Sequence, residues 1–394
     1  MSESARPWGV LSGVRPSKIV HRWLDQGMSR TQIEEGLKRD YRLSPDKARR
    51  LVEVASRQRP WLLSREQAKR LVSVYIGIPF CPSRCLYCSF PSYPLPSAGS
   101  LMEDFLRALG YEVRTMGEAL RRQLLAVQTI YVGGGTPTSL PVDRLARLLD
   151  QVNQHLRHSG TYELTVEGGR PETLSEPMLK ALRAAGVTRL SINPQTLKDE
   201  TLRTIGRHHT AREVIRAFWR AREVGIPCLN MDLILGLPGE TMAELEATLA
   251  EVTRLEPDNL TVHPLAIKRA SRLKAETSAW TLPHPRQVVE MFAGAEKCAE
   301  ALGLYPYYLY RQKNTLGNLE NTGYARPGYE GVYNIQIIEE RQTIVGLGAG
   351  AGSKWVDADT GALSNSYHPK EPAAYVARVE ELARRQVDKL FGMG

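Results

Sequence analysis

Tyr75-Ile-Gly-Ile-Pro-Phe-Cys81-Pro-Ser-Arg-Cys85-Leu-Tyr-Cys88 places three cysteines within eight positions, directly after an apolar, β-rich run. Thiolates are the expected ligands of iron–sulfur clusters. Three ligands leave one iron of a four-iron cluster open to a chelating cofactor or substrate. A structural zinc site is the alternative, but it normally needs four protein ligands, and no fourth Cys or His lies nearby in the sequence. The sequence therefore predicts a [4Fe–4S] cluster on Cys81, Cys85 and Cys88.

The run before Cys81 is the first of six short β-rich runs that alternate with longer helical patterns. The predicted strands are Val72–Ile78, Thr129–Gly133, Tyr162–Glu167, Arg189–Pro194, Cys228–Leu235 and Asn259–Leu265. The predicted helices lie near residues 101–124, 141–157, 176–185, 198–224, 240–254 and 285–302. Six βα repeats predict an α/β fold with a parallel sheet and functional loops after the strand carboxyl ends. Periodicity leaves open whether the sheet is a partial barrel or a flat doubly wound sheet.

The segments before and after these six repeats do not show the alternation of strands and helices. Residues 15–58 predict short helices, with a capping box at Thr31-Gln-Ile-Glu34 and an N-cap and proline at Ser44-Pro45. After residue 303 an aromatic-rich stretch leads to Gly346-Leu-Gly-Ala-Gly-Ala-Gly352, and residues 371–391 predict an amphipathic helix. We expect a helical N-terminal module at 1–71, the main domain at 72–302, and a C-terminal α+β module on the substrate side at 303–394.

The net charge of +9 is concentrated at the N-terminus, because residues 1–72 carry 16 Lys or Arg against 8 Asp or Glu. A basic module attracts nucleic acid or other polyanions, but a solvated helix face is the commoner explanation. Since the module also lacks the aromatic interleaving of a base-stacking surface, we expect nucleic-acid binding to be weak and steeply salt-dependent.

The remaining cysteines, Cys228 and Cys298, lie in an apolar strand-like run and a helical run, where free cysteine is usually a small buried hydrophobe. An odd number of cysteines with three clustered together is a poor disulfide framework. No apolar run approaches the roughly 20 residues needed to span a bilayer, and the N-terminus lacks a secretory signal pattern. We therefore expect a cytoplasmic location and no membrane span.

Glycines and polar residues stand where the predicted parallel strands end. Gly133-Gly-Gly-Thr-Pro137 closes the second strand, where glycines let the backbone approach a ligand; a tight turn is the alternative. Glu167 closes the third strand, Gln195 the fourth and Asp232 the fifth. Each suits an ordinary polar strand end, but burying such groups without partners is costly. Their shared placement predicts one common site.

The C-x3-C-x2-C run after a strand, with the aromatic Tyr87 before the last cysteine, resembles the signature of the radical S-adenosylmethionine (SAM) superfamily. The longer string from Tyr75 to Cys81 resembles the oxygen-independent coproporphyrinogen III oxidases and related heme chaperones. This resemblance implies a partial (β/α)6 radical SAM barrel. It also implies that SAM chelates the open iron and that one electron splits it to methionine and a 5′-deoxyadenosyl radical.

The resemblance implies a set of SAM contacts. Gly133-Gly-Gly-Thr-Pro137, which begins 45 residues after Cys88, matches the segment that contacts the SAM ammonium. Arg207 matches a contact in which a guanidinium holds the SAM carboxylate by paired hydrogen bonds, with a solvated helix residue as the alternative. Tyr75 matches a contact near the methionine moiety and Ala266 a backbone contact near adenine, with packing as the alternative for both. The implied SAM-binding residues are Tyr75, Tyr87, Gly134, Gly135, Thr136, Glu167, Gln195, Arg207, Asp232 and Ala266.

Three further stretches look similar to the HemZ-type branch, the coproporphyrinogen dehydrogenase-like proteins of Gram-positive bacteria. They are Pro7-Trp-Gly-Val-Leu-Ser-Gly-Val-Arg-Pro16, Ser191-Ile-Asn-Pro-Gln195 and Leu309-Tyr-Arg-Gln-Lys-Asn314. Members of that branch usually begin further upstream, so we expect the chain to lack part of their N-terminal extension. One departure concerns activity: the anaerobic oxidases continue as C-x3-C-x2-C-x-C, whereas Phe90 stands at the last position here, as in the heme chaperones.

The resemblance implies oxidative decarboxylation of two propionates of coproporphyrinogen III, with catalysis centred on Cys81, Cys85 and Cys88. It implies a tetrapyrrole substrate and a reduced flavodoxin or ferredoxin-type electron donor. A heme-binding chaperone and a nucleic-acid modifying radical enzyme stay open as alternatives. We expect the substrate mouth at Tyr307, Tyr308, Tyr310, Arg311, Gln312 and Lys313, with Arg311 and Lys313 meeting propionates; an aromatic packing stripe is the alternative.

Overall fold

The computed structural model describes residues 7–90, 92–95 and 100–392. Contacts divide the chain into two compact units, each made of two segments. Unit 1 contains Met1–Leu62 and Met231–Glu339, and unit 2 contains Leu63–Asn230 and Glu340–Gly394. The division into segments 1–71, 72–302 and 303–394 stays a prediction. None of the described helices is long and apolar enough to cross a bilayer.

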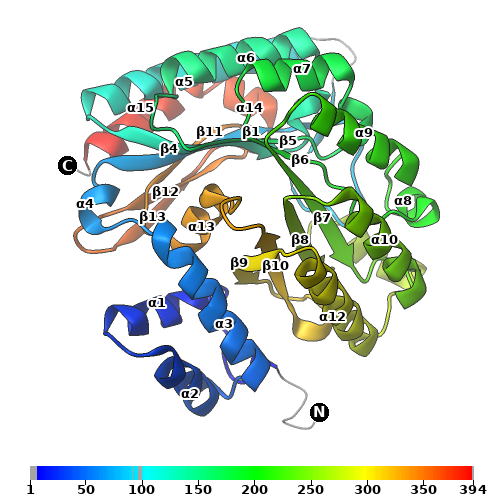
Figure 1. The fold of residues 1–394 in the computed structure, drawn as a ribbon. Coiled ribbons are helices and arrows are strands. Elements are labelled where there is room, and N and C mark those ends of the chain that lie inside the picture. The colour runs from blue at the N-terminus through cyan, green and yellow to red at the C-terminus, as the bar shows by residue number, and fades with distance from the viewer. Residues whose placement is uncertain (1–6, 91, 96–99, 393–394) are drawn as a thin grey trace. The chain divides into compact units, whose positions relative to one another are not determined.

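Unit 2 is built around parallel strands that lie side by side in chain order, as the sequence predicts (Figure 1). They are β1 (Leu71–Ile78), β4 (Ala126–Gly134), β5 (Glu163–Glu167), β6 (Arg189–Ser191) and the first residues of β7 (Cys228–Leu235). The helices α5 (Ser100–Arg122), α6 (Val142–His155) and α7 (Glu176–Ala184) run along one face of β1, β4 and β5 (Figure 1). Because helices cover these strands, most of their side chains are buried.

The predicted helix over 198–224 is wrong, because two helices occupy this segment. They are α8 (Asp199–Thr204) and α9 (Ala211–Glu223). Gly206 has a φ of +76°, which ends the first helix, and Thr210 and Glu213 form a capping box that starts the second. The break places Arg207 in a loop.

The C-terminal segment adds strands that the alternation did not predict. Strand β11 (Ile344–Gly348) pairs in parallel with β1, and β12 (Gly352–Val356) and β13 (Leu363–Tyr367) continue antiparallel. A Cβ on Gly348 would lie 2.4 Å from the carbonyl oxygen of Gly77, so this pairing needs glycine. The predicted helix over 371–391 is two helices, α14 (Pro372–Val376) and α15 (Val379–Phe391).

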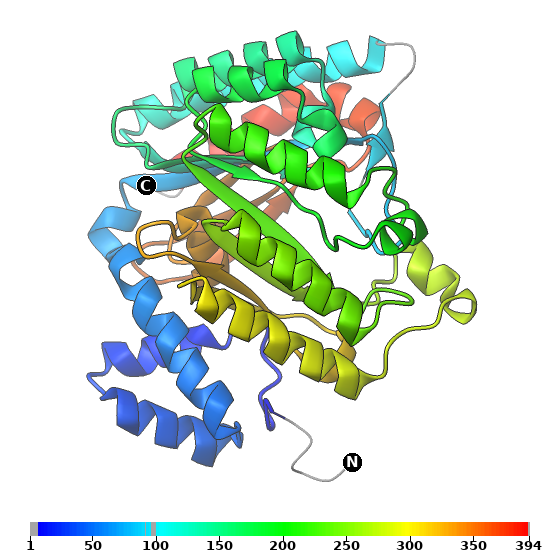
Figure 2. The same cartoon turned by 45° about the vertical axis from the view of Figure 1, so that its right-hand side comes forward.

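Unit 1 contains the rest of β7, followed in sheet order by β8 (Asn259–Pro264), β10 (Glu320–Ala325) and β9 (Tyr305–Arg311). Strand β10 is antiparallel to both of its neighbours. The helices α10 (Met242–Leu255) and α12 (Pro285–Ala301) lie side by side (Figure 2). Strands β7 and β8 complete the six predicted strands, and the α/β class is confirmed.

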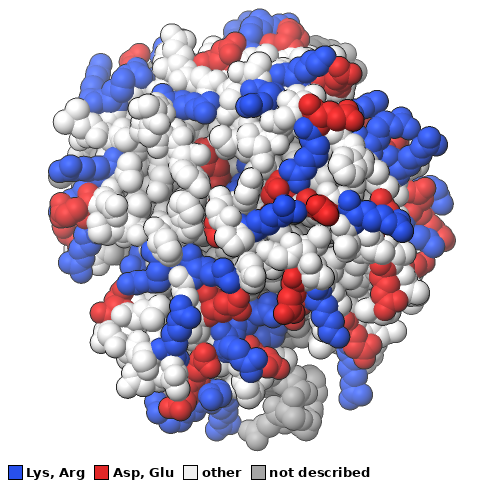
Figure 3. All heavy atoms as spheres, viewed as in Figure 1, with Lys and Arg blue, Asp and Glu red and all other residues white. Residues whose placement is uncertain are grey.

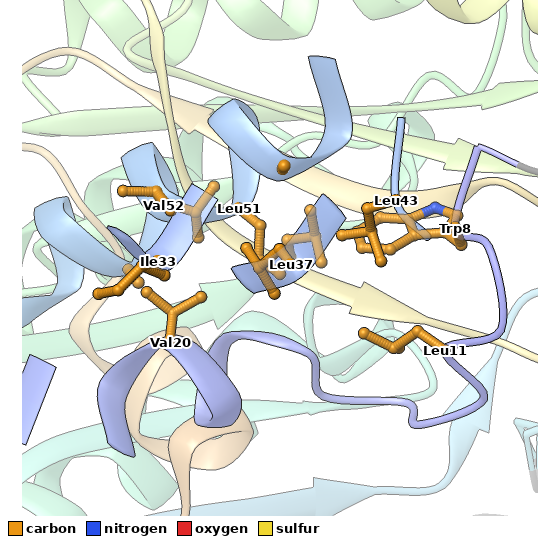
Figure 4. Packing of buried hydrophobic residues seen from close by; sticks show 12 residues of the cluster. Trp8, Leu11, Val20, Ile33, Leu37, Leu43, Leu51 and Val52 are labelled. Atoms are coloured by element: carbon orange, nitrogen blue, oxygen red, sulfur yellow. The ribbon is translucent and has the colours of Figure 1, made fainter. Parts of the chain in front are cut away.

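The N-terminal helices of unit 1 are α1 (Ser17–Asp25), α2 (Arg30–Tyr41) and α3 (Pro45–Gln58). Their apolar side chains form one core with Leu309 of β9, and Figure 4 shows part of it. Glu320 of β10 is buried and accepts hydrogen bonds from the Trp8 indole nitrogen, at 2.8 Å, and from Lys47. The predicted N-cap at Ser44 with Pro45 is confirmed. The capping box at Thr31 is wrong, since Ser29 and Gln32 form it instead.

Short elements complete the fold. They are α4 (Arg65–Ala68), β2 (Phe80–Cys81), β3 (Tyr93–Pro94), α11 (Arg272–Ala275) and α13 (Val332–Glu339).

Candidate functional site

The three cysteines lie in one loop of unit 2, directly after β1. Phe80 and Cys81 form β2, which pairs in parallel with β3, a pairing that the sequence did not predict. The loop is fixed at its far end, because the Leu86 amide donates to the Ile205 carbonyl at 3.0 Å. Cys85 is buried, and Cys81 and Cys88 are half-buried.

The glycine turn after β4 packs directly against Cys81. The amides of Gly135 and Thr136 donate to the carbonyls of Ile78 and Phe80, each at 2.7 Å, and the Thr136 hydroxyl donates to Cys81 Sγ at 3.5 Å. A Cβ on Gly135 would lie 2.4 Å from the Phe80 carbonyl and 3.0 Å from Cys81 Sγ. Only glycine fits this position. Burial raises the pKa of the Cys81 thiol to about 11, and it also raises the pKa of Cys88.

Two buried arginines surround Cys85. Arg170 Nη2 donates to Cys85 Sγ at 3.3 Å. Arg207 Nη1 donates to the carbonyls of Gly169, at 3.1 Å, and Asn193, and its guanidinium also interacts with Cys85 and Tyr87. Burial alone would raise the pKa of Cys85, but the two positive charges outweigh it and lower the pKa below the usual value of a thiol. The site therefore favours a thiolate at Cys85.

Glu167 ends β5, as predicted, and its carboxylate is held at the end of β4. Tyr131 donates its hydroxyl to Glu167 Oε1 at 2.6 Å, and the Gly134 amide donates to Oε2 at 3.2 Å. Tyr75 stacks on Tyr131 with the ring centroids 6.1 Å apart. The structure thus brings Tyr75, Gly134 and Glu167 together, and their contacts with SAM stay predictions.

Gln195 does not end a strand, because β6 stops at Ser191. It lies four residues further on, in a loop, with a φ of +68°. Its side chain is buried, and its Oε1 has no hydrogen-bond partner within the described ranges. A buried carbonyl oxygen without a donor is costly unless a ligand supplies one. A ligand that donates a hydrogen bond would satisfy this atom, and the role of Gln195 in SAM binding stays a prediction.

Asp232 and Ala266 belong to unit 1. The prediction that Asp232 ends a strand is wrong, since it lies in the middle of β7. Its carboxylate is 3.8 Å from Nε2 of His263 on β8, and the other ring nitrogen of His263 is 2.8 Å from Asn321 Oδ1 on β10. Ala266 is half-buried and forms an isolated β-bridge with Thr315.

Tyr307 and Tyr308 of β9 belong to one buried cluster of unit 1, with their ring centroids 5.0 Å apart, at a register shift between β9 and β10. The expectation that Arg311 meets a propionate stays a prediction. Its guanidinium donates to the Leu11 carbonyl and to Asn318, and lies 5.1 Å from the Trp8 ring. Tyr307 is buried and accepts a hydrogen bond from Asn334 at 3.0 Å.

Tyr310 packs against this cluster. Tyr308 and Tyr310 stack with their ring centroids 6.2 Å apart, and Gln312 donates to the Tyr310 hydroxyl at 2.9 Å. Lys313 is exposed. Tyr307 and Tyr308 are therefore buried in packing, as the alternative of an aromatic packing stripe predicts, and the substrate mouth stays a prediction.

Sequence reasoning missed Arg170, which lies three residues after Glu167 in Gly-Gly-Arg-Pro and is 2% exposed. The available signal was its position after a strand carboxyl end, where the other site residues were sought. Cys228 and Cys298 are buried, as predicted.

The residues present fit a four-iron cluster and SAM. Three thiols share one loop, and the turn at Gly135 leaves no room for a side chain against Cys81. Gln195 adds the buried oxygen that lacks a partner. In the described part of the chain, no group of three or more His, Cys, Asp or Glu side chains converges to hold one metal ion. A cluster offers a separate iron to each thiolate, so its ligands need not converge on one point.

Known proteins share both the sequence and the fold. Residues 75–252 match the model of the Radical SAM superfamily. The chain is 42% identical over 384 residues to the oxygen-independent coproporphyrinogen-III oxidase-like protein HemZ of Bacillus subtilis (strain 168), covering 97% of this chain and 77% of that protein. It is 34% identical over 282 residues to the heme chaperone HemW of the same organism, covering 71% and 70%.

The solved structure of coproporphyrinogen III oxidase (HemN) from Escherichia coli has the same fold, with a TM-score of 0.61 and 24% identity over 84% of this chain and 73% of that one. The identity to the HemZ relative over nearly the whole chain, the matching superfamily model and the cysteine loop agree. The chain belongs to the radical SAM superfamily, in the family of oxygen-independent coproporphyrinogen-III oxidase-like proteins, whose cofactors are a [4Fe–4S] cluster and SAM.

Proposed function

We propose that the protein is a cytoplasmic oxidoreductase that converts coproporphyrinogen III to protoporphyrinogen IX without oxygen. The observation that carries the proposal is the 42% identity, over 97% of the chain, to a relative named oxygen-independent coproporphyrinogen-III oxidase-like. The five cysteines are free thiols, which supports a reducing compartment such as the cytoplasm.

The proposed reaction removes the carboxyl groups of two propionate side chains. From each propionate, one hydrogen atom leaves the β-carbon, carbon dioxide is released, and one further electron passes to an acceptor, so that a vinyl group remains. When bound, the cluster and SAM supply the one-electron chemistry that removes the hydrogen atom. A reduced flavodoxin or a ferredoxin-type protein is the proposed electron donor.

The residues of unit 2 would hold these cofactors. Cys81, Cys85 and Cys88 would bind three irons. The charges of Arg207 and Arg170 lower the pKa of the Cys85 thiol, which favours the thiolate that binds metal. The half-buried turn at Gly134 and Gly135 would present backbone groups to SAM. These residues bind and orient the cofactors, which is the contribution that the protein makes to cofactor chemistry.

A heme chaperone is the second candidate. The observation that favours it is Phe90, which stands two residues after Cys88 and is 64% exposed. A large apolar ring exposed beside the cysteine loop offers a surface for a flat tetrapyrrole. The 34% identical chaperone relative supports the same reading.

Anaerobic turnover separates the two candidates. Reconstituted protein is incubated with SAM, dithionite and coproporphyrinogen III, and 5′-deoxyadenosine, carbon dioxide and porphyrin products are measured beside a heme titration. An oxidase must hold the propionate β-carbon next to the reacting centre, so substrate should accelerate 5′-deoxyadenosine formation and yield protoporphyrinogen. Stoichiometric tight heme binding, with 5′-deoxyadenosine formed equally slowly with and without coproporphyrinogen, would favour the chaperone and exclude the oxidase.

A nucleic-acid substrate is not proposed, because many basic groups of the N-terminal helices already have partners in unit 1. Arg59 pairs with Asp25 at 2.6 Å, Arg50 with Glu296 at 3.3 Å, and Lys47 with Glu320. Figure 3 shows Lys and Arg interspersed with Asp and Glu on one face of the molecule. Binding to tRNA should therefore be weak and fall steeply with salt. Submicromolar affinity at physiological salt would restore this candidate.

A further inference from the structure

Arg170 is a buried cation at a cluster cysteine, and neither the sequence pattern nor the family resemblance pointed to it. We propose that Arg170 is a positioning residue that hydrogen-bonds the Cys85 thiolate and raises the reduction potential of the cluster. The proposal rests on cluster binding by this loop and not on the tetrapyrrole substrate, so a failure to decarboxylate coproporphyrinogen leaves it intact.

The guanidinium of Arg170 binds the cysteine loop at several atoms through a single nitrogen. Nη2 is 3.3 Å from Cys85 Sγ, 2.8 Å from the Ser83 carbonyl oxygen and 2.9 Å from the Ser83 hydroxyl. Ser83 in turn donates its hydroxyl to the Gly206 carbonyl at 2.8 Å. Arg170 therefore fixes both the thiol and the loop that carries it.

Arg170 pairs with Glu172, which in turn pairs with His209. Arg170 Nη1 lies 3.6 Å from Glu172 Oε1, and Glu172 Oε2 lies 2.7 Å from Nδ1 of His209. Arg170 and His209 are almost fully buried, while the Glu172 side chain is 30% exposed. The Thr173 hydroxyl donates to the Arg170 carbonyl at 2.7 Å and fixes the backbone. The guanidinium is thus hydrogen-bonded to the cysteine loop through Nη2 and ion-paired with Glu172 through Nη1.

A fixed positive charge beside the thiolate changes the reduction potential of the cluster. Reduction adds one negative charge to the cluster, and a nearby cation stabilises that charge more strongly in a buried site than in water. Hydrogen bonds to the ligand sulfurs and net charge are the levers by which proteins set cluster potentials. Arg170 supplies both, so its removal should make the cluster harder to reduce.

The test is a redox titration of the reconstituted protein, followed by electron paramagnetic resonance of the reduced cluster. Arg170→Met should lower the reduced-to-oxidised ratio at a fixed potential about tenfold, which corresponds to a drop of about 59 mV for a one-electron couple. Arg170→Lys keeps the positive charge but loses the planar set of guanidinium N–H donors. It should therefore shift the reduced-to-oxidised ratio less than Arg170→Met does. Arg212→Met, which removes an exposed arginine of α9, is the matched control and should leave the ratio unchanged.

Glu172→Gln gives a second test of opposite sign. It removes the negative charge that faces Arg170 while leaving the guanidinium in place, so the reduced-to-oxidised ratio should rise. Iron content and visible absorption confirm that each variant carries a full cluster. An unchanged midpoint potential in fully loaded Arg170→Met would overturn the proposal. If that variant fails to hold iron, an unchanged or lowered potential in Glu172→Gln overturns it instead.

Discussion

Nε2 of His263 lies 3.8 Å from the carboxylate of Asp232, so two neighbouring strands of unit 1 are joined by an ion pair whenever the imidazole is protonated. Burial lowers the pKa of His263, but the hydrogen bond and charge of Asp232, together with Asn321, outweigh it and raise the pKa above its ordinary value. Burial raises the pKa of the nearby Tyr310 phenol to about 12, so that phenol stays neutral over the pH range in which His263 titrates.

The first prediction concerns the titration of His263. A raised pKa in the folded state means that protonation stabilises the fold, fully below the unfolded value of about 6.5, and that this contribution is lost as the pH rises through the folded pKa. Nuclear magnetic resonance of the histidine ring protons, assigned with His263→Gln, should give a pKa above about 6.5. Asp232→Asn should lower it, and an equal pKa in both proteins would show that the pair does not form.

The second prediction concerns the cluster itself. Replacing Cys81, Cys85 and Cys88 together by Ala removes all three thiolates, so anaerobic reconstitution should give about four irons per chain in the wild type and almost none in the variant. Iron analysis and visible absorption are the measurements. Cys298→Ala is the control, because Cys298 is buried between α10 and α12 with its sulfur 3.4 Å from the Thr253 hydroxyl. Full iron content in the triple variant would contradict the assignment of the site.

The third prediction separates two glycines of the same unit. Gly135→Ala forces a Cβ to within 2.4 Å of the Phe80 carbonyl, whereas Gly169→Ala meets nothing within 4 Å. Overpacking of this kind costs roughly 1–3 kcal/mol, and here the strain falls on the segment that carries Cys81. Gly135→Ala should therefore lower both the unfolding temperature and the iron content, while Gly169→Ala should leave both near the wild-type values. Equal behaviour of the two variants would argue against a tight turn at Gly135.

The sequence predicts those parts of the site that are local. The spacing of the cysteines and the strand ends near Gly134 and Glu167 can be recognised in the sequence itself. Because parallel strands end at one edge of a sheet, these strand ends are expected to lie in one site. Arg170 was missed because its importance comes from a contact with Cys85 that is 85 residues away in the sequence. Periodicity carries no information about such a contact.

The same reasoning explains the errors in the fold. Strand β11 was missed because its glycines give it little β character, and its pairing with β1 depends on residues that are more than 260 positions apart. The burial of Tyr307 and Tyr308 in one cluster could not be predicted, because tyrosine suits both a core and a binding surface. The contacts of Arg311 could not be predicted for a related reason: its partners, Leu11 and Trp8, lie at the other end of the chain.

The last prediction tests the role of Arg207 in SAM binding. Arg207 is 4% exposed and carries a raised pKa, because Tyr87 and Cys85 favour its charged form against the opposing effect of burial. The charge is therefore permanent at any working pH, as a partner for the SAM carboxylate needs to be. Loss of one charge-assisted hydrogen-bonded pair costs roughly 1.5–3 kcal/mol, so Arg207→Ala should raise the dissociation constant for SAM about tenfold or more. The measurement is equilibrium binding of SAM to the reconstituted protein, corrected for iron content because Arg207 also contacts Cys85. Arg203→Ala, which removes the basic residue in the last turn of α8, is the control and should bind SAM as the wild type does. A SAM dissociation constant that is the same in Arg207→Ala and in the control, at equal iron content, would limit Arg207 to holding the Gly169 and Asn193 carbonyls.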